Sequence, residues 1–258
     1  MTVFELFYPG TRIELEDRNL AFELQSYLSA IESRFNDAAV VLSLFEESRA
    51  QHLTDMENRI HGPSSVQEPE SDELGQAQFE PGMDGRTFLL HFMNRQLEAK
   101  RRRWEAGERP QAYTSRLLFV YARSFLFSLW DVRNLLGQLA RCPGISDEAR
   151  NIARAFDAAF PTLKGLRDSS AHIDERVARQ AHGRPIAPKP LDNVLVKAPS
   201  GGVLVVESLV NNRFVGTTSD GEFGEVEVST DTMAKVQECV QSLLNSLPWS
   251  GMSRHCPE

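Results

Sequence analysis

The sequence is poor in cysteine, in long apolar runs and in net positive charge, and each shortage excludes a class of structure or function. Three cysteines occur in 258 residues, far apart and without a C-x-x-C pair, so neither a disulfide framework nor a zinc site is expected. No segment approaches the roughly 18 uncharged residues that a membrane span needs, and the N-terminus lacks the features of a signal peptide. We therefore expect a cytoplasmic protein without membrane contact.

The charge balance is acidic, with a formal net charge of -8. Bulk attraction to a polyanion is therefore disfavoured, and any contact with nucleic acid has to use a local basic patch. Hydrophobic residues make up 41% and charged residues 25%, which is ordinary for a protein that folds around a core. The sequence contains no internal repeat.

The N-terminal third predicts one long helix followed by a linker. Apolar residues at alternating steps of three and four predict an amphipathic helix over about 17–59. Residues 61–85 are rich in Gly, Pro, Ser and acids and have no period, which predicts a mobile loop or linker. A second helix is expected from about Arg86 to Gly107. The apolar series of the first helix is Leu20, Leu24, Leu28, Ile31, Phe35, Ala38, Leu42 and Phe45.

The segment "LLFVYARSFLFSLWDVRNLLGQLA", residues 117–140, is apolar nearly all the way round, which is typical of a helix in the middle of a bundle. The charges within it, such as Arg123 and Arg133, need partners, so we expect a packed ion pair or a dimer contact. Ser146 is expected to cap the next helix. Pro161 either kinks that helix or begins a fifth one.

After the helices, short β-branched runs over about 203–229 predict a three-stranded meander, and a closing helix is expected over about 230–247. The expected fold is mainly α, an up-and-down helical bundle with a small antiparallel β insertion before the last helix. The expected domains are an N-terminal long helix over 1–60, a flexible linker over 61–85, and a helical bundle over 86–258. The apolar face of the closing helix is Met233, Val236, Val240 and Leu244.

The run "GLRDSSAHIDERV", residues 165–177, gathers arginines, carboxylates, hydroxyls and an imidazole. His172 follows Asp168 by four residues, which places the two side chains on one helical face, one turn apart. Arg167 can clamp a phosphate, and His172 can titrate near neutral pH while Asp168 orients it. These groups suit the handling of a phosphodiester without a metal, and we take Arg167, Asp168 and His172 as the catalytic candidates.

The spacing of Arg167 and His172 occurs a second time, in Arg86 and His91. There the residues between are mostly large and apolar, and we interpret them as the buried face of the second helix. The first motif differs because a polar residue follows the arginine and small residues fill the interval. Two of these, Ser169 and Ser170, are candidate substrate-binding residues. They do not indicate a serine hydrolase, because no G-x-S-x-G elbow accompanies them.

The pattern Arg167-Asp168-Ser169-Ser170-Ala171-His172, in a late helix of a helical bundle, resembles the HEPN superfamily (higher eukaryotes and prokaryotes nucleotide-binding). The resemblance implies a bundle of four or five helices, commonly dimeric. It also implies a metal-independent endoribonuclease of a toxin, defence or RNA-processing system, without a cofactor. Arg167 and His172 are then the catalytic pair, with Asp168 in the supporting polar position. This sequence has Asp where the family often has Asn.

The implied reaction is attack of the ribose 2′-hydroxyl on the adjacent phosphorus, with one imidazole as base and a second group as acid. A single histidine hardly serves both roles, so a homodimer with two facing motifs is expected. Two alternatives stay open. The chain is either such an enzyme or a noncatalytic HEPN-like module that binds a nucleotide or a protein, such as an antitoxin or regulator. The motif residues can also form a purely structural polar cluster.

The second helix ends in the basic and aromatic run Lys100-Arg101-Arg102-Arg103-Trp104. Basic and aromatic side chains together can hold an RNA backbone and stack on a base. Lys100, Arg102 and Arg103 are therefore candidate substrate-binding residues. The same run also suits a solvated helix end, where cations offset the negative end of the helix dipole.

Overall fold

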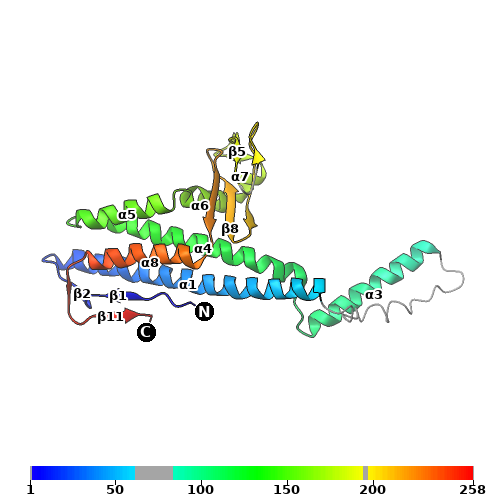
Figure 1. Cartoon of the computed structure of the whole chain (residues 1–258), viewed down its shortest axis with the longest axis horizontal. Helices are drawn as coiled ribbons and strands as arrows, with labels where there is room; N and C mark the ends of the chain where they lie inside the picture. The colour runs from blue at the N-terminus through cyan, green and yellow to red at the C-terminus, as the bar shows by residue number, and fades with distance from the viewer. Residues whose placement is uncertain (1, 62–83, 194–196, 258) are drawn as a thin grey trace. The chain divides into compact units, whose positions relative to one another are not determined.

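The computed structural model describes residues 2–61, 84–193 and 197–257, with the backbone alone for 58–61. The described chain is mainly helical and carries small antiparallel sheets, as expected (Figure 1). The expected linker falls almost entirely on 62–83, outside the described residues. Within the described residues the helices are α1 (Arg18–His61), α3 (Gly85–Glu105), α4 (Gln111–Leu139), α5 (Asp147–Ala159), α6 (Leu163–Ala171), α7 (Ile173–Val177) and α8 (Thr230–Asn245).

Within the described residues the strands are short, and each strand pair is antiparallel. β1 pairs with β11, β10 with β2, β3 with β4 and β5 with β6, while β7, β8 and β9 form a three-stranded sheet in that order. The strands are β1 (Leu6–Tyr8), β2 (Arg12–Ile13), β3 (Gln180–Ala181), β4 (Arg184–Pro185), β5 (Leu191–Asp192), β6 (Lys197–Ala198), β7 (Ser208–Val210), β8 (Arg213–Thr217), β9 (Phe223–Glu227), β10 (Trp249–Ser250) and β11 (Arg254–Cys256).

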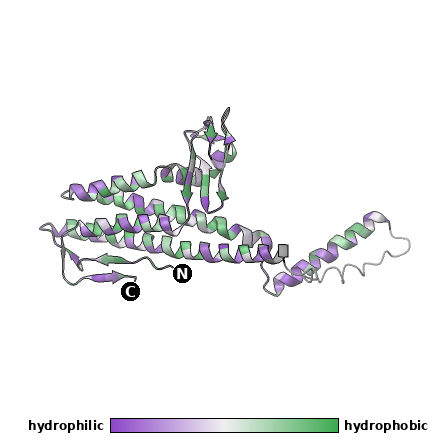
Figure 2. Ribbon diagram, viewed as in Figure 1, coloured by the Kyte–Doolittle hydropathy of each residue, from purple (hydrophilic) through white to green (hydrophobic). Residues whose placement is uncertain are grey.

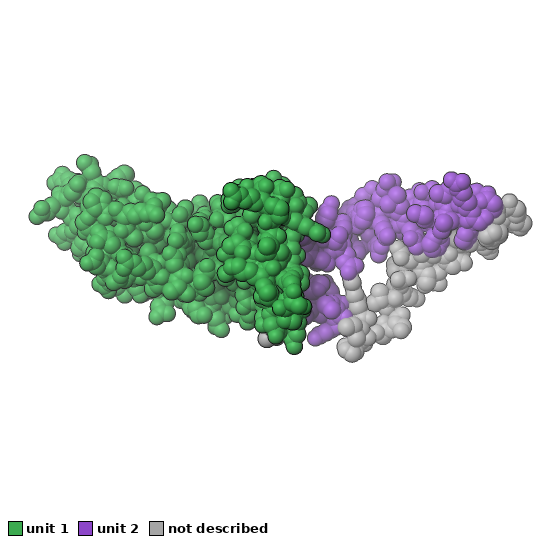
Figure 3. All heavy atoms as spheres, turned by 90° about the horizontal axis from the view of Figure 1, so that it is seen from above, with its two compact units in different colours: residues 1–46, 119–258 green, residues 47–118 purple. Residues whose placement is uncertain are grey.

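The chain divides into two compact units, coloured separately in Figure 3. The first comprises residues 1–46 and 119–258, and the second comprises residues 47–118. Helices α1 and α4 therefore contribute residues to both units, whereas α3 belongs wholly to the second. Among the described residues, no helix combines the length and the apolar character that crossing a membrane requires.

The core of the first unit confirms the apolar periods of its helices. In α1 the expected apolar residues from Leu24 to Phe45 are all buried, and in α8 Met233, Val236, Val240 and Leu244 are buried as well. α4 buries nine residues between Phe119 and Leu139, as expected of a helix that is apolar nearly all the way round. Ser146 caps α5 by accepting from the Ala149 N–H at 3.2 Å, as expected.

In contrast, α3 buries none of its residues. Arg86 and His91, whose neighbours were expected to form a buried face, are themselves exposed, and so are Leu89 and Leu90 between them. The expectation of a buried face was therefore wrong, because apolar residues indicate a helix face but do not show whether another element covers it.

Both ends of the described chain are tied to α1 by a polar cluster around Glu32. Its carboxylate accepts from Arg254 Nη2 at 2.7 Å and from Cys256 Sγ at 2.8 Å, and the Arg254 guanidinium lies 3.9 Å from the centre of the Tyr8 ring. Burial raises the pKa of Glu32, but hydrogen bonds from Arg254, Cys256 and Tyr8 outweigh burial and hold the pKa below its usual value.

Because the pKa of Glu32 is lower in the folded protein, the cluster stabilises the fold above the unfolded pKa of about 4.3. This contribution is lost as the pH falls through the folded pKa. We expect Glu32→Gln to remove it, so that urea midpoints measured from about pH 6 down to about pH 3 fall less steeply for the variant than for the wild type. The exposed Glu16→Gln should keep the wild-type slope, and equal slopes in all three proteins would contradict the assignment.

Candidate functional site

The motif lies on α6, which is held against the three-stranded sheet. α6 packs on β8 and β9, and Thr162 Oγ1 donates to the Glu225 carbonyl at 2.8 Å. Gly165 permits the close approach, because a Cβ at that position would lie 2.5 Å from Thr218 Cγ2. The lack of a side chain at Gly165 therefore allows α6, which carries Arg167 and Asp168, to lie this close to Thr218.

Arg167 and Asp168 contact each other directly. Arg167 Nη1 lies 3.1 Å from Asp168 Oδ1, and each side chain is about one third exposed. Arg167 Nε is buried and finds no acceptor among the described residues. The guanidinium is thus partly accessible, but one carboxylate already offsets its charge.

His172 lies just beyond the end of α6. Its backbone dihedrals, φ -113° and ψ 49°, are not helical, although its N–H still bonds to the Asp168 carbonyl at 3.1 Å. α6 therefore ends at Ala171, one residue before His172, because the chain turns into α7 at His172. The helical geometry expected between Asp168 and His172 does not extend to His172. The imidazole is exposed and makes no hydrogen bond or ion pair with the described residues. Its ring is free to meet a ligand.

A row of alternating arginines and aromatic rings runs along α4 and includes Arg167. The Arg167 guanidinium carbon lies 5.8 Å from the Phe127 ring centre and 5.6 Å from that of Trp130. Arg123 lies 5.5 Å from Phe127, and Arg133 lies 5.2 Å from Trp130. Each distance is within the range of a cation–π contact. The sequence indicated the arginines of α4 as charges in need of partners, but not the rings that lie between them.

The other two arginines of this row also have carboxylate partners. Arg133 forms a bidentate salt bridge with Asp157, in which Nε donates to Oδ1 at 2.6 Å and Nη2 donates to Oδ2 at 2.8 Å. This interaction raises the pKa of Arg133. Arg123 Nε lies 3.7 Å from Glu207. Both of these α4 arginines therefore have the ion-pair partners that were expected, but these pairs are only partly buried. Together with the Arg167 and Asp168 pair, the row holds three cations and three anions and has no excess positive charge to attract a phosphate.

The two serines of the motif are buried and bonded within the protein. Ser169 Oγ donates to the Thr217 carbonyl at 3.0 Å, and Ser170 Oγ donates to Glu207. The Ser170 carbonyl accepts from Arg123 Nη2 at 2.9 Å. Both hydroxyls therefore join α6 to its neighbours, and their role in binding a substrate stays a prediction.

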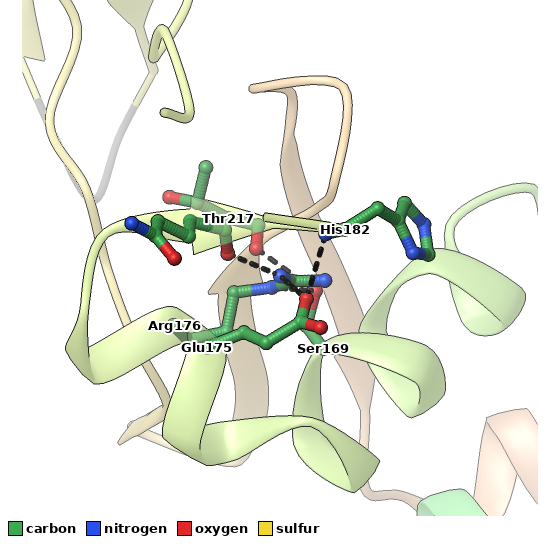
Figure 4. A network of polar contacts seen from close by, with 6 residues as sticks. Ser169, Glu175, Arg176, His182 and Thr217 are labelled. Carbon is green, nitrogen blue, oxygen red and sulfur yellow. Dashed lines mark hydrogen bonds and ion pairs between the residues drawn. The ribbon is translucent and has the colours of Figure 1, made fainter. Parts of the chain in front are cut away.

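Arg176 of α7 completes this buried network, which Figure 4 shows together with Ser169 and Glu175. Its side chain is 1% exposed. Its Nε donates to Ser169 Oγ at 3.1 Å, and its Nη1 donates to the Gln180 carbonyl at 2.6 Å and lies 3.6 Å from Glu175. Glu175 in turn accepts from the His182 N–H at 2.8 Å. A fully buried arginine at this position could not be found from the sequence, where "DERV" reads as a solvated run.

The basic run of the second helix lies in the other unit. Lys100 and Arg103 line a pocket of about 660 Å³ together with Trp104 and residues from the end of α1 and the start of α4. Arg102 does not line it, and Arg103 lies 3.9 Å from Glu108. A role for Lys100, Arg102 and Arg103 in binding a substrate stays a prediction.

Arg167 and Asp168 are thus brought together on α6, while His172 follows in the turn into α7 and no contact within the described residues joins its imidazole to either of them. The motif offers one partly exposed cation and one exposed imidazole. Neither a protein-family model, nor a curated protein, nor a solved structure matches the chain.

Proposed function

We propose that the chain is a HEPN-like, metal-independent endoribonuclease of the kind found in toxin or defence systems. The observation that carries the proposal is the exposed imidazole of His172, which stands in the turn that follows the partly exposed Arg167 and Asp168 pair. The proposal includes an up-and-down arrangement of the bundle helices. It also includes a homodimer in which two motifs face one cleft, because one imidazole cannot act as base and acid in the same step.

In the proposed reaction the imidazole of one His172 takes the proton from a ribose 2′-hydroxyl. The 2′-oxygen forms a bond to the adjacent phosphorus, and the bond from phosphorus to the 5′-oxygen breaks. The leaving oxygen takes a proton from the partner motif's imidazolium. The Arg167 guanidinium stabilises the negative charge that develops on the phosphoryl oxygens. The products carry a 2′,3′-cyclic phosphate and a 5′-hydroxyl.

The test is incubation of the purified protein with single-stranded RNA in the presence of EDTA. We expect the RNA to be cut and a DNA strand of the same sequence to survive, because DNA lacks the 2′-hydroxyl nucleophile. Equal cutting of both strands, or dependence of RNA cleavage on an added divalent metal, would contradict the proposal.

A second candidate function is a noncatalytic HEPN-like module that binds a nucleotide or a partner protein. The pairing of Arg167 with Asp168, and its place between Phe127 and Trp130, favour this candidate. These contacts offset the charge that Arg167 would need in order to stabilise a phosphorane, whereas a bound nucleotide needs only the partly exposed N–H donors of its guanidinium. This candidate predicts that the wild-type protein leaves RNA uncut in the cleavage assay, and that a separate titration detects nucleotide binding that Arg167→Ala abolishes.

A further inference from the structure

Helix α3 carries a stripe of exposed apolar side chains. We define it by Leu90, Met93, Leu97 and Trp104, with Leu89 at its edge. These side chains are between 40% and 57% exposed, although large apolar residues on a helix of a soluble protein ordinarily face another element. None of the 21 residues of α3 is buried. Figure 2 shows the hydrophobic residues set among hydrophilic ones along this helix.

The spacing of the stripe is that of a helix-to-helix seam. From Leu90 the steps are three to Met93 and four to Leu97, then three to Lys100 and four to Trp104. Alternation of three and four keeps the side chains on one narrow line that a second helix can cover. Lys100 lies within that line. A cation inside the seam suits a partner helix with a facing carboxylate, and it is unfavourable in the apolar layer of a membrane.

The charge of α3 indicates which helix would cover it. α3 carries six cationic side chains and two acidic ones, a net charge of +4 on a chain whose overall charge is -8. Among the described residues, no ion pair includes Arg86, Lys100 or Arg101. A second copy of α3 would bring like charges together at this seam, which disfavours self-pairing.

We propose that the α3 stripe is a docking surface for an acidic amphipathic helix of a partner protein. The partner's apolar residues cover Leu90, Met93, Leu97 and Trp104, and its flanking carboxylates face Lys100 and Arg101. This mode of recognition uses apolar anchors spaced by three and four residues for affinity and charge for selectivity. The proposal does not rest on the ribonuclease function, because binding is measured without any cleavage.

The test uses the full chain and two synthetic peptides that share a leucine seam, one with flanking glutamates and one with flanking lysines. We expect the glutamate peptide to bind at least about ten-fold more tightly than the lysine peptide in titration calorimetry, with the difference shrinking at high salt. Leu97→Glu should weaken binding of the glutamate peptide at least about ten-fold, since it places a charge in the seam.

The matched control is Asn94→Glu, which adds the same charge to the same exposed helix but away from the stripe. It should weaken binding of the glutamate peptide by less than about three-fold, since it adds only a screened surface charge. Because α3 has no buried residue, both variants should keep the wild-type circular dichroism spectrum. Three results would overturn the proposal: equal binding of both peptides, binding of anionic phosphatidylglycerol vesicles in place of the glutamate peptide, or self-association of the wild type that Leu97→Glu abolishes.

Discussion

Replacing His172 with alanine is expected to lower the rate of RNA cleavage by about 10²–10⁴-fold, because the imidazole is the proposed proton-transfer group. The fold should be unaffected, since the side chain is exposed and makes no hydrogen bond with the described residues. Initial rates on one RNA oligonucleotide, measured with equal amounts of folded wild type and variant, give the comparison.

Arg167→Ala should lower the cleavage rate by a comparable factor of about 10²–10³, because it removes charge stabilisation of the phosphorane. The second copy of the same spacing provides the controls. Arg86→Ala and His91→Ala change exposed residues of α3 and should keep the wild-type rate. Equal rates for wild type and His172→Ala would show that the activity belongs to another site or to a contaminant.

Replacing Arg176 with alanine is expected to lower the free energy of unfolding by about 3–5 kcal/mol, the range for breaking a buried charged contact. The arginine is 1% exposed, and its loss removes the donor to Ser169 Oγ and to the Gln180 carbonyl. It also leaves Glu175 without its cation. Urea denaturation followed by circular dichroism gives the difference in free energy.

Arg184→Ala is the matched control for this prediction, because Arg184 is exposed and lies on β4, close in the sequence. Its effect should stay within about 0.5 kcal/mol. A loss below about 1 kcal/mol for Arg176→Ala would mean that the buried network contributes little to the fold. In that case the contacts of Ser169 would need another explanation.

The helices of the first unit could be predicted well from the sequence because their apolar periods are long. α1 and α8 bury the residues that their spacing indicated, except Leu20, which is only half-buried, and Ser146 caps α5. The strand propensity of β-branched residues also distinguished strands from helices, since β8 and β9 form where such residues predicted a meander. The small antiparallel sheets that join β1 to β11 and β2 to β10 were not foreseen, because pairing across more than two hundred residues leaves no local pattern.

The candidate site was predictable only as a set of residues. The spacing of Arg167 and His172 is visible in the sequence, but the turn at His172 is not. Small polar residues such as Ser169 and Ser170 occur both on surfaces and in buried networks, so the sequence does not show which applies. In the structure they are buried and hydrogen-bonded to Thr217 and Glu207. The place of Arg167 near Phe127 and Trp130 depends on where the fold puts α6 relative to α4, which no local pattern encodes.

The most direct test of the central claim is the chemical nature of the ends that the protein leaves on RNA in the presence of EDTA. A substrate with a single 2′-deoxy nucleotide at the cleaved position provides the comparison. The proposed mechanism predicts a 2′,3′-cyclic phosphate and a 5′-hydroxyl on the all-ribose strand, and no cut at the deoxy position. A 5′-phosphate product, or cleavage at the deoxy position, would contradict attack by the 2′-hydroxyl and with it the proposed role of His172.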